Sequence, residues 1–358
     1  MKTTKEQQKD ILSILDTLGI ESKANEAMHS TQSGYGDEFV PEDLAQSVIE
    51  KARDKSVILS RIPAENVFDP MPTQPYDVPV EGGDPTFYAT AESTGVVASE
   101  YTNSKAGTAK LQLDAKKYTA ITYISGEIDE DARLAGGIRN YVENKMAKAF
   151  AELVDKSWVN GDIVTAGSGN VNSDDGAPAG GTYYLHQDGL VKYAVGNSKT
   201  HDVGTLETTD LTKIRALLGL LGANPAELLW LFNLETYYQL MTLTQVETME
   251  KFGNMATINN GVLERLQGIP VTALSTFLKA ESDGKVSVTP GNNTLGRLLL
   301  VHLPSLYFGW RRKMKVVVEY LPRVDQYAIT AHSRFAIKVN TQNSTQVPVA
   351  MGRNVTIA

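Results

Sequence analysis

The chain has 358 residues, of which 42% are hydrophobic, and its formal net charge is −8. This length is enough for one large or two modest hydrophobic cores, so folding needs no metal or disulfide. Cysteine is absent, which excludes thiol nucleophiles, thiolate zinc sites and disulfides. The acidic balance argues against indiscriminate binding to nucleic acid, because such binding needs clustered lysines and arginines.

The N-terminal part predicts two short helices and no membrane segment. No apolar run reaches the ~20 residues of a membrane span, and the first residues, MKTTKEQQKDIL, lack the apolar core of a signal peptide. We therefore expect a protein that is soluble and intracellular where it is made. The helical spacing of Ile11, Leu15 and Leu18 before Gly19 predicts the first helix, and a second is expected to begin near Pro41.

Residues 62–109 are rich in proline, glycine and threonine and contain only short alternations of apolar and polar residues, for example at residues 76–80. They never gather enough apolar residues to fold alone, so we expect an extended excursion that needs a neighbour. Residues 110–116 alternate regularly and predict a half-buried return strand. The apolar face of that strand consists of Leu111, Leu113 and Ala115.

The strongest pattern is a long amphipathic helix at 138–159. A segment that alternates like a strand (118–125, YTAITYIS) and an acidic turn (127–131) precede it. Within the helix, apolar residues recur every four positions, which places them on one face of a rod about 30 Å long. These residues are Ile138, Val142, Met146, Phe150, Val154 and Trp158. Gly136 and Gly137 mark the start of the helix, and Asn160-Gly161-Asp162 marks its end.

The segment 162–204 is predicted to be an exposed loop with a hairpin at 183–195, because it is rich in glycine, serine, asparagine and aspartate. A compact alternation of helices and strands follows. Thr209 is expected to cap a helix that stops at Gly222, and Asn233 to cap a second helix.

The rest of the chain is predicted to be rich in strands. Buried strands are expected at 228–232 and 298–302, and residues 263–271 lead into another. Residues 314–349 are predicted to be mostly strand, because apolar and polar residues alternate between 327 and 339.

Three short motifs occur in the same order in a known family. They are Gly34, Gly36, Val40 and Pro41 before the second helix, Ile124-Ser125-Gly126-Glu127 before the long helix, and Leu263-Glu-Arg-Leu-Gln-Gly268-Ile-Pro270-Val271 before a strand. In this order the sequence resembles the major capsid proteins of tailed bacteriophages, from about residue 34 to residue 350. The resemblance implies an α+β Hong Kong 97-like capsid fold.

The resemblance also implies a division into domains. Residues 1–36 would form an N-terminal arm and residues 61–116 an extended β loop that reaches across a neighbouring subunit. A peripheral domain would comprise 37–60, 117–205 and 311–358 and include the long helix as a spine. An axial domain would comprise 206–310. Only about 33 residues precede the first family motif, so we expect the N-terminal segment to be retained rather than removed by a protease.

The function implied is self-assembly into pentamers and hexamers of an icosahedral head that encloses double-stranded DNA. Implied partners are copies of the same chain, together with scaffold, portal and decoration proteins, and the packaged DNA would be contacted weakly. The protein would reside in the virion capsid after assembly in the host cytoplasm. The alternative is an encapsulin-like shell, which would share the fold but enclose an enzyme.

Catalytic and metal-binding motifs are absent from the sequence. The histidines, His29, His186, His201, His302 and His332, form no i, i+4 pair and no HExxH motif, so each is expected to be exposed or hydrogen-bonded. Gly167-Ser168-Gly169 lacks the strand-turn-helix context of a nucleophile elbow. The one-three-five spacing of Asn170, Asn172 and Asp174 is typical of calcium ligands, but the glycine and closing glutamate of such a loop are missing.

Two charged runs also have simpler interpretations. Arg311-Arg312-Lys313-Met314-Lys315 could bind phosphate, but its position favours a charged strand entry or an ion pair between subunits. The acidic residues 127–131 are expected to favour the N-terminal dipole of the long helix rather than to form a catalytic cluster.

Some capsid relatives form a lysine–asparagine isopeptide bond, for which Lys105, Lys110, Lys116, Lys117, Asn340 and Asn343 are the candidates in this sequence. No pairing among them is favoured. The sequence therefore predicts a structural protein, not an enzyme, with no catalytic, cofactor-binding or metal-binding residue.

Overall fold

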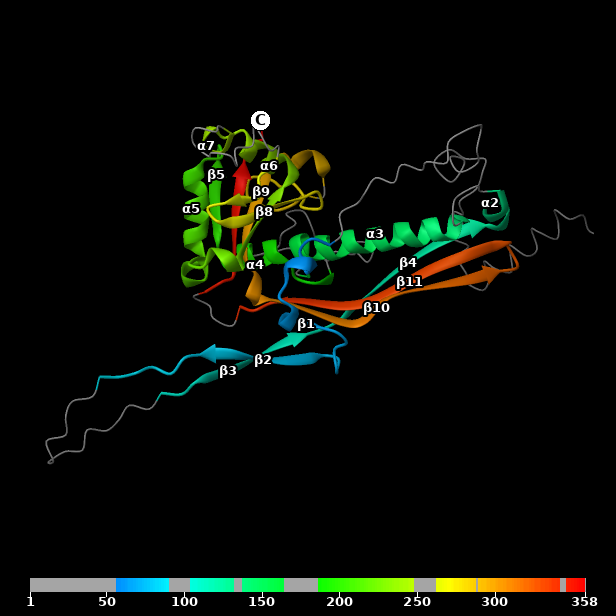
Figure 1. The fold of residues 1–358 in the computed structure, drawn as a ribbon, viewed down its shortest axis with the longest axis horizontal. Helices are drawn as coiled ribbons and strands as arrows, with labels where there is room; N and C mark the ends of the chain where they lie inside the picture. Colours follow the sequence, from blue (N-terminus) through cyan, green and yellow to red (C-terminus); the bar gives the residue numbers. More distant parts are fainter. Residues whose placement is uncertain are drawn as a thin grey trace, which may run out of the picture. The chain divides into compact units, whose positions relative to one another are not determined.

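The computed structural model describes residues 56–89, 104–131, 137–163, 186–247, 262–287, 289–341 and 346–357. The two N-terminal helices predicted near residues 11–18 and 41–52 lie outside these ranges. The chain divides into two compact units. Thr119–Ala147 and Lys315–His332 belong to the first, and the remaining described residues belong to the second. Figure 1 shows the arrangement of elements within each unit.

A six-stranded mixed sheet is the centre of the second unit. Its order is β5 (Thr200–Gly204), β12 (Val349–Val355), β9 (Gly296–His302), β6 (Leu228–Asn233), β8 (Ile269–Leu274) and β7 (Arg265–Leu266). β9 runs antiparallel to both β12 and β6, whereas β6 and β8 are parallel. Every residue of β6 and β9 is buried, which explains why both read as continuous apolar runs. The buried strands predicted at 228–232 and 298–302 are confirmed.

Successive residues of β6 and β9 point into two different hydrophobic cores. Leu229, Leu231, Leu299 and Val301 join a core that includes Trp158 of the long helix. Leu228, Trp230, Phe232, Leu298 and Leu300 join the core that includes Leu211 and Ile214 of α5 (Thr208–Leu217) and Leu240 of α6 (Leu234–Met241). The alternation of side chains along each strand therefore gives the sheet one core on each face.

Three local predictions for this unit are wrong. In place of the hairpin expected at 183–195, α4 occupies Leu190–Gly196, because Leu190, Val191 and Ala194 are buried at helical spacing. The cap of α5 is Glu207 rather than Thr209, since Glu207 and Asp210 form a reciprocal capping box. α5 also ends at Leu217, and a separate 3-10 helix occupies Gly219–Gly222.

The cap predicted for α6 is confirmed. The Asn233 side-chain oxygen accepts a hydrogen bond of 2.9 Å from the Thr236 backbone N–H. A short helix, α7 (Thr244–Glu247), follows α6.

The long helix is confirmed as α3 (Gly137–Asn160). Of its six step-four apolar residues, Phe150 is half-buried and the other five are buried. The helix stops at Gly161, where a Cβ atom would lie 2.2 Å from the Gln187 carbonyl oxygen. The acidic residues expected to form a turn are instead helical, within α2 (Gly126–Asp131). Within the first unit, the Gly126 N–H donates to the Asp325 carbonyl at 2.8 Å and fixes the start of α2.

A four-stranded sheet has the order β1 (Val67–Phe68), β10 (Leu306–Leu321), β11 (Gln326–Val339) and β4 (Lys116–Ser125). The alternation predicted for 327–339 is confirmed in β11. The basic run at 311–315 does not precede a strand but lies within β10.

A separate two-stranded sheet pairs β2 (Tyr76–Gly83) with β3 (Gly107–Leu113). The strand predicted at 110–116 is interrupted after Leu113, and β4 begins only at Lys116. The cause is Gln74, whose amide accepts from the Ala115 N–H at 3.2 Å and donates to the Ala115 carbonyl at 3.3 Å. These bonds take the place of strand pairing at the junction.

The described residues therefore combine several sheets with a small number of helices, in agreement with the expected mixture of helix and strand. Among the described residues, no helix is both long enough and apolar enough to cross a membrane.

Candidate assembly surfaces

The hairpin β2–β3 is a projecting arm whose base is anchored in the second unit (Figure 1). Its register runs from Tyr76 opposite Leu113 to Gly83 opposite Gly107. At the base, Leu111 and Leu113 are buried against Met71 and Ala336. The expected apolar face of the return strand is thus confirmed.

Beyond this base the arm has little apolar contact of its own. Phe87 is 98% exposed and Tyr88 is 51% exposed. A fully exposed phenylalanine leaves a large apolar area in water, and such exposure is typical of a binding surface. The outer part of the arm therefore has apolar groups available to another chain.

Cross-strand polar contacts stiffen the arm. Asp77 of β2 accepts from Lys110 at 2.8 Å and from Gln112 at 3.1 Å. These hydrogen bonds lower the pKa of Asp77, and the bond to Asp77 raises the pKa of Lys110. Because both groups face solvent, the pair contributes more to the register of the strands than to stability.

The basic run in β10 holds the start of the arm. The Arg311 guanidinium donates to the Met71 carbonyl at 2.7 Å and to the Pro72 carbonyl at 3.3 Å. Lys313 forms an ion pair with Asp69, at 2.5 Å. These two residues of the basic run therefore bond within their own chain. The sequence favours a charged strand entry or an ion pair between subunits, and neither describes these contacts.

The C-terminal half of α3 is fixed by buried polar contacts. Asp155 is buried and accepts from the Ser56 hydroxyl at 2.8 Å and from the Val57 N–H at 3.1 Å. At the last residue of the helix, the Asn160 amide donates to the Thr276 carbonyl at 2.9 Å. The end of the rod is therefore held by specific hydrogen bonds in addition to apolar packing.

Arg297 completes this anchor from inside the sheet. It lies in β9, is 0% exposed and donates to the carbonyls of Leu278 and Gly284 and to the Asn160 side-chain oxygen. The Phe277 ring lies 4.9 Å from the guanidinium carbon. Burial lowers the pKa of Arg297 to about 9, so the group still carries its charge at neutral pH.

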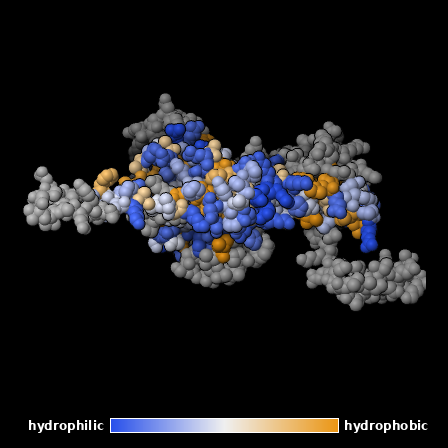
Figure 2. All heavy atoms as spheres, turned by 90° about the horizontal axis from the view of Figure 1, so that it is seen from below, coloured by the Kyte–Doolittle hydropathy of each residue, from blue (hydrophilic) through white to orange (hydrophobic). Residues whose placement is uncertain are grey.

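Further exposed apolar side chains lie on both units. In the second unit, Leu220 is 76% exposed, Tyr238 on α6 is 54% exposed and Val262 is 56% exposed. In the first unit the large exposed apolar residues are Ile121, Val317, Val318, Tyr320 and Val324. Figure 2 shows apolar groups as patches between hydrophilic areas on one face.

The described histidines do not converge on one site. His201 bonds to Asp210 at 3.0 Å, and His302 lies between Glu227 (3.0 Å) and the Ser305 hydroxyl (2.9 Å). These two residues are hydrogen-bonded, as expected.

The remaining histidines show no common partner. His186 is half-buried and has an edge contact with the Tyr118 ring. His332 is half-buried, and its Nδ1 atom has no hydrogen-bond partner among the described residues. His29 lies outside the described ranges. Among the described residues, no three histidine, aspartate or glutamate side chains are arranged to hold a metal ion.

The remaining sequence candidates are the glycine–serine motif, the asparagine-rich segment and the isopeptide residues. Gly167-Ser168-Gly169 and the asparagine-rich segment with Asn170, Asn172 and Asp174 lie outside the described residues. Of the isopeptide candidates, Lys110 bonds to Asp77, Lys116 bonds to Asp114, and the Asn340 backbone N–H donates to the Ser305 carbonyl. Asn343 lies outside the described ranges.

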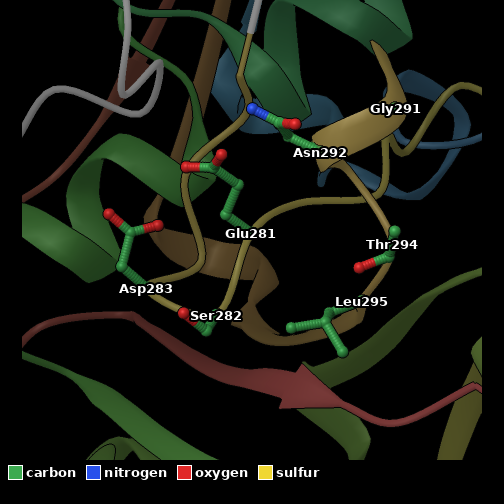
Figure 3. Close-up of a pocket in the computed structure, with 7 residues that line it drawn as sticks. All are labelled: Glu281, Ser282, Asp283, Gly291, Asn292, Thr294 and Leu295. Carbon is green, nitrogen blue, oxygen red and sulfur yellow. The ribbon is translucent and has the colours of Figure 1, made fainter. Parts of the chain in front are cut away.

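One recess of about 660 Å³ lies beside the loop that Arg297 holds. Figure 3 shows the Glu281 and Asp283 carboxylates on one turn and Asn292 and Thr294 on a neighbouring segment. The turn is closed by its own backbone, and the Asp283 side chain accepts from the Lys285 N–H at 2.9 Å. The recess therefore has polar walls whose groups already serve the loop.

Comparison with known proteins shows the family of this chain. The model of the Phage capsid family matches residues 36–349. The chain belongs to the phage capsid family. It is a capsid shell protein, a structural component of the virion that forms a lattice with copies of itself. No match was found among curated proteins.

Solved structures support the same fold at low sequence identity. A chain from Mycobacterium phage Bobi is 15% identical with a TM-score of 0.59, and the match covers 91% of this capsid protein and 98% of that chain. A chain from Microbacterium phage Oxtober96 is 14% identical with a TM-score of 0.61, with coverage of 91% and 98%. A chain from the capsid of a native GTA particle is 12% identical with a TM-score of 0.59, with coverage of 92% and 100%.

The anchor of α3 was not predicted from the sequence. Arg297 interrupts an otherwise apolar run, Gly296 to Val301, and this was the available signal. An unpaired buried charge is costly, so an arginine within an apolar strand-like run is expected either to reach solvent or to join a buried hydrogen-bond network.

Proposed function

We propose that this capsid protein is the major shell subunit of a tailed bacteriophage and assembles as pentamers and hexamers into an icosahedral head around double-stranded DNA. The observation that carries the proposal is the β2–β3 arm, whose Phe87 is 98% exposed in the single chain. Arms that bury little surface alone bury much in a lattice, so shell strength would come from contacts between chains.

We propose a Hong Kong 97-like division of the chain. Residues 1–36 form an N-terminal arm, 61–116 the extended loop, and 206–310 the axial domain. Residues 37–60, 117–205 and 311–358 form the peripheral domain with α3 as its spine. We amend this division at two strands, because β5 (Thr200–Gly204) and β12 (Val349–Val355) pair in one sheet with β9 and therefore belong with the axial residues.

Assembly would take place in the host cytoplasm, with scaffold, portal and decoration proteins as further partners. The packaged DNA would touch the shell weakly. The net charge of −8 supports this, because a shell protein of net negative charge weakly repels a dense polyanion and so lets it slide instead of adhering.

Electron microscopy of the purified protein after gentle assembly, with mass photometry on the same sample, tests the proposal. Closed icosahedral shells or five- and six-membered rings are expected. A chain that remains monomeric or dimeric at every salt concentration would overturn the proposal. Shells that exclude DNA and enclose a protein would indicate an encapsulin-like compartment instead.

A further inference from the structure

Among the described residues, the outer edge of β10 has no strand partner in the first unit. On that side, β1 pairs only with Phe308 and Gly309 of β10, yet β10 continues to Leu321. β10 therefore pairs with β11 on one side, but on the side of β1 no described strand lies next to residues 315–321. An open edge presents unpaired N–H and C=O groups to any other strand of suitable sequence.

The side chains on this edge favour pairing. The sequence from Lys315 to Glu319 is Lys-Val-Val-Val-Glu, and Val317 and Val318 are each 40% exposed. Natural edges are usually protected by proline, bulges or central charges, whereas here three consecutive β-branched residues occupy the middle. The charged residues stand only at the two ends, and both are exposed.

This segment is complementary to itself in antiparallel orientation. In a regular strand only every second residue presents its N–H and C=O to the open edge. When two copies pair, each such residue must lie opposite another such residue, so opposed residue numbers are both odd or both even. When Val317 lies opposite Val317, Lys315 of each copy lies opposite Glu319 of the other. With the axis at Val318, Glu319 lies opposite Val317 and no ion pair forms. With the axis at Val316, Lys315 lies opposite Val317 and Glu319 lies opposite Lys313, but Lys313 already forms an ion pair with Asp69 of its own chain. The axis through Val317 therefore pairs both Lys315 and Glu319 without breaking that contact.

We propose that β10 pairs in antiparallel orientation with β10 of a second copy, about a two-fold axis through Val317. The pairing joins the two sheets into one and covers the exposed valines. A two-fold contact uses the same patch on both partners, which the charge pattern of this segment satisfies. Its place as a link within a shell rests on the proposed function, but the pairing itself does not.

A single introduced thiol tests the pairing, because the chain contains no cysteine. In Val317→Cys the two thiols would face each other across the axis. Opposed residues in antiparallel strands have Cα atoms about 4.5 or 5.5 Å apart, within the range that a disulfide spans. We expect a covalent dimer after mild oxidation, measured on a non-reducing gel. Val324→Cys, at a position in the β10–β11 turn that is 53% exposed, is the matched control and should remain monomeric.

Each outcome separates the pairing from the shell. If shells form and only Val317→Cys gives a covalent dimer, both proposals are supported. If shells form without a covalent dimer, the pairing is overturned and the proposed function stands. If the dimer forms but shells do not, the function is overturned and the pairing is supported; if neither shells nor dimer form, both are overturned. Equal dimer from Val324→Cys overturns the pairing, since it would indicate random collision.

Charge reversal provides a second, independent readout in the Val317→Cys background. Lys315→Glu places two carboxylates opposite each other at both ends of the pair, so we expect the rate of dimer formation to fall roughly tenfold at low salt. Glu319→Lys should slow dimer formation to a similar extent. The double variant Lys315→Glu/Glu319→Lys restores opposite charges and should recover the rate. Failure of the double variant to recover would contradict the register.

Discussion

Replacement of Arg297 by methionine should strongly destabilise the second unit. The substitution keeps much of the side-chain volume but leaves three acceptors without this donor: the partly buried Leu278 carbonyl, the buried Gly284 carbonyl and the buried Asn160 side-chain oxygen. Each orphaned acceptor costs about 1–3 kcal/mol. Removal of the buried charge returns part of that cost, so we expect a net loss of about 3–5 kcal/mol in the free energy of unfolding.

Urea unfolding followed by tryptophan fluorescence measures this loss, because Trp158 and Trp230 are both 0% exposed. Arg353→Met is the matched control. Arg353 contacts the same loop through one hydrogen bond of 2.8 Å to the Asp283 carbonyl, so its loss should cost only about 1 kcal/mol. If Arg297→Met were no more destabilising than Arg353→Met, the argument that Arg297 anchors this loop and the end of α3 would be refuted.

Three further outcomes are expected. Gly161→Ala should unfold at a lower urea concentration than Gly196→Ala, because a Cβ at Gly161 would clash with backbone oxygen whereas nothing lies within 4 Å at Gly196. Burial raises the pKa of Asp210, but hydrogen bonds from its neighbours outweigh this and hold the pKa below 3.8. Its stabilising contribution is therefore present above about pH 4 and lost as the pH falls further, and Asp210→Asn should flatten the acid side of the stability profile. Phe87→Ser should leave the urea midpoint of the unassembled chain unchanged but reduce shell yield in electron micrographs, whereas Phe87→Leu should retain that yield.

The parts of the fold in which apolar residues follow a regular spacing or a continuous run could be predicted from the sequence. The step-four spacing in α3 and the continuous apolar runs of β6 and β9 leave few alternatives, because burial of one helix face or of both strand faces requires those patterns. Asn233 was also predictable as a cap, since its role depends on residues only three positions away.

Features set by distant residues could not be predicted. The break between β3 and β4 depends on Gln74, which lies about forty residues from the junction it occupies. α4 is stabilised by the buried contacts of Leu190, Val191 and Ala194 with a core that also contains strand residues, and a glycine-rich neighbourhood hid this. The arm was predicted as an extended excursion from its lack of apolar residues, but the exposure of Phe87 required the structure.

Three other edge strands, β2, β3 and β4, show why the end of β10 is distinctive. β2 carries Pro79, which has no N–H to offer, and its partner β3 carries Lys110. β4, at the opposite edge of the four-stranded sheet, begins with Lys116 and Lys117. These residues disfavour the addition of a further strand. The three valines of β10 lack such protection, and their flanking charges match only when a second copy runs in the opposite direction. An edge of this kind is better explained as a specific contact between copies than as a surface that remains in water.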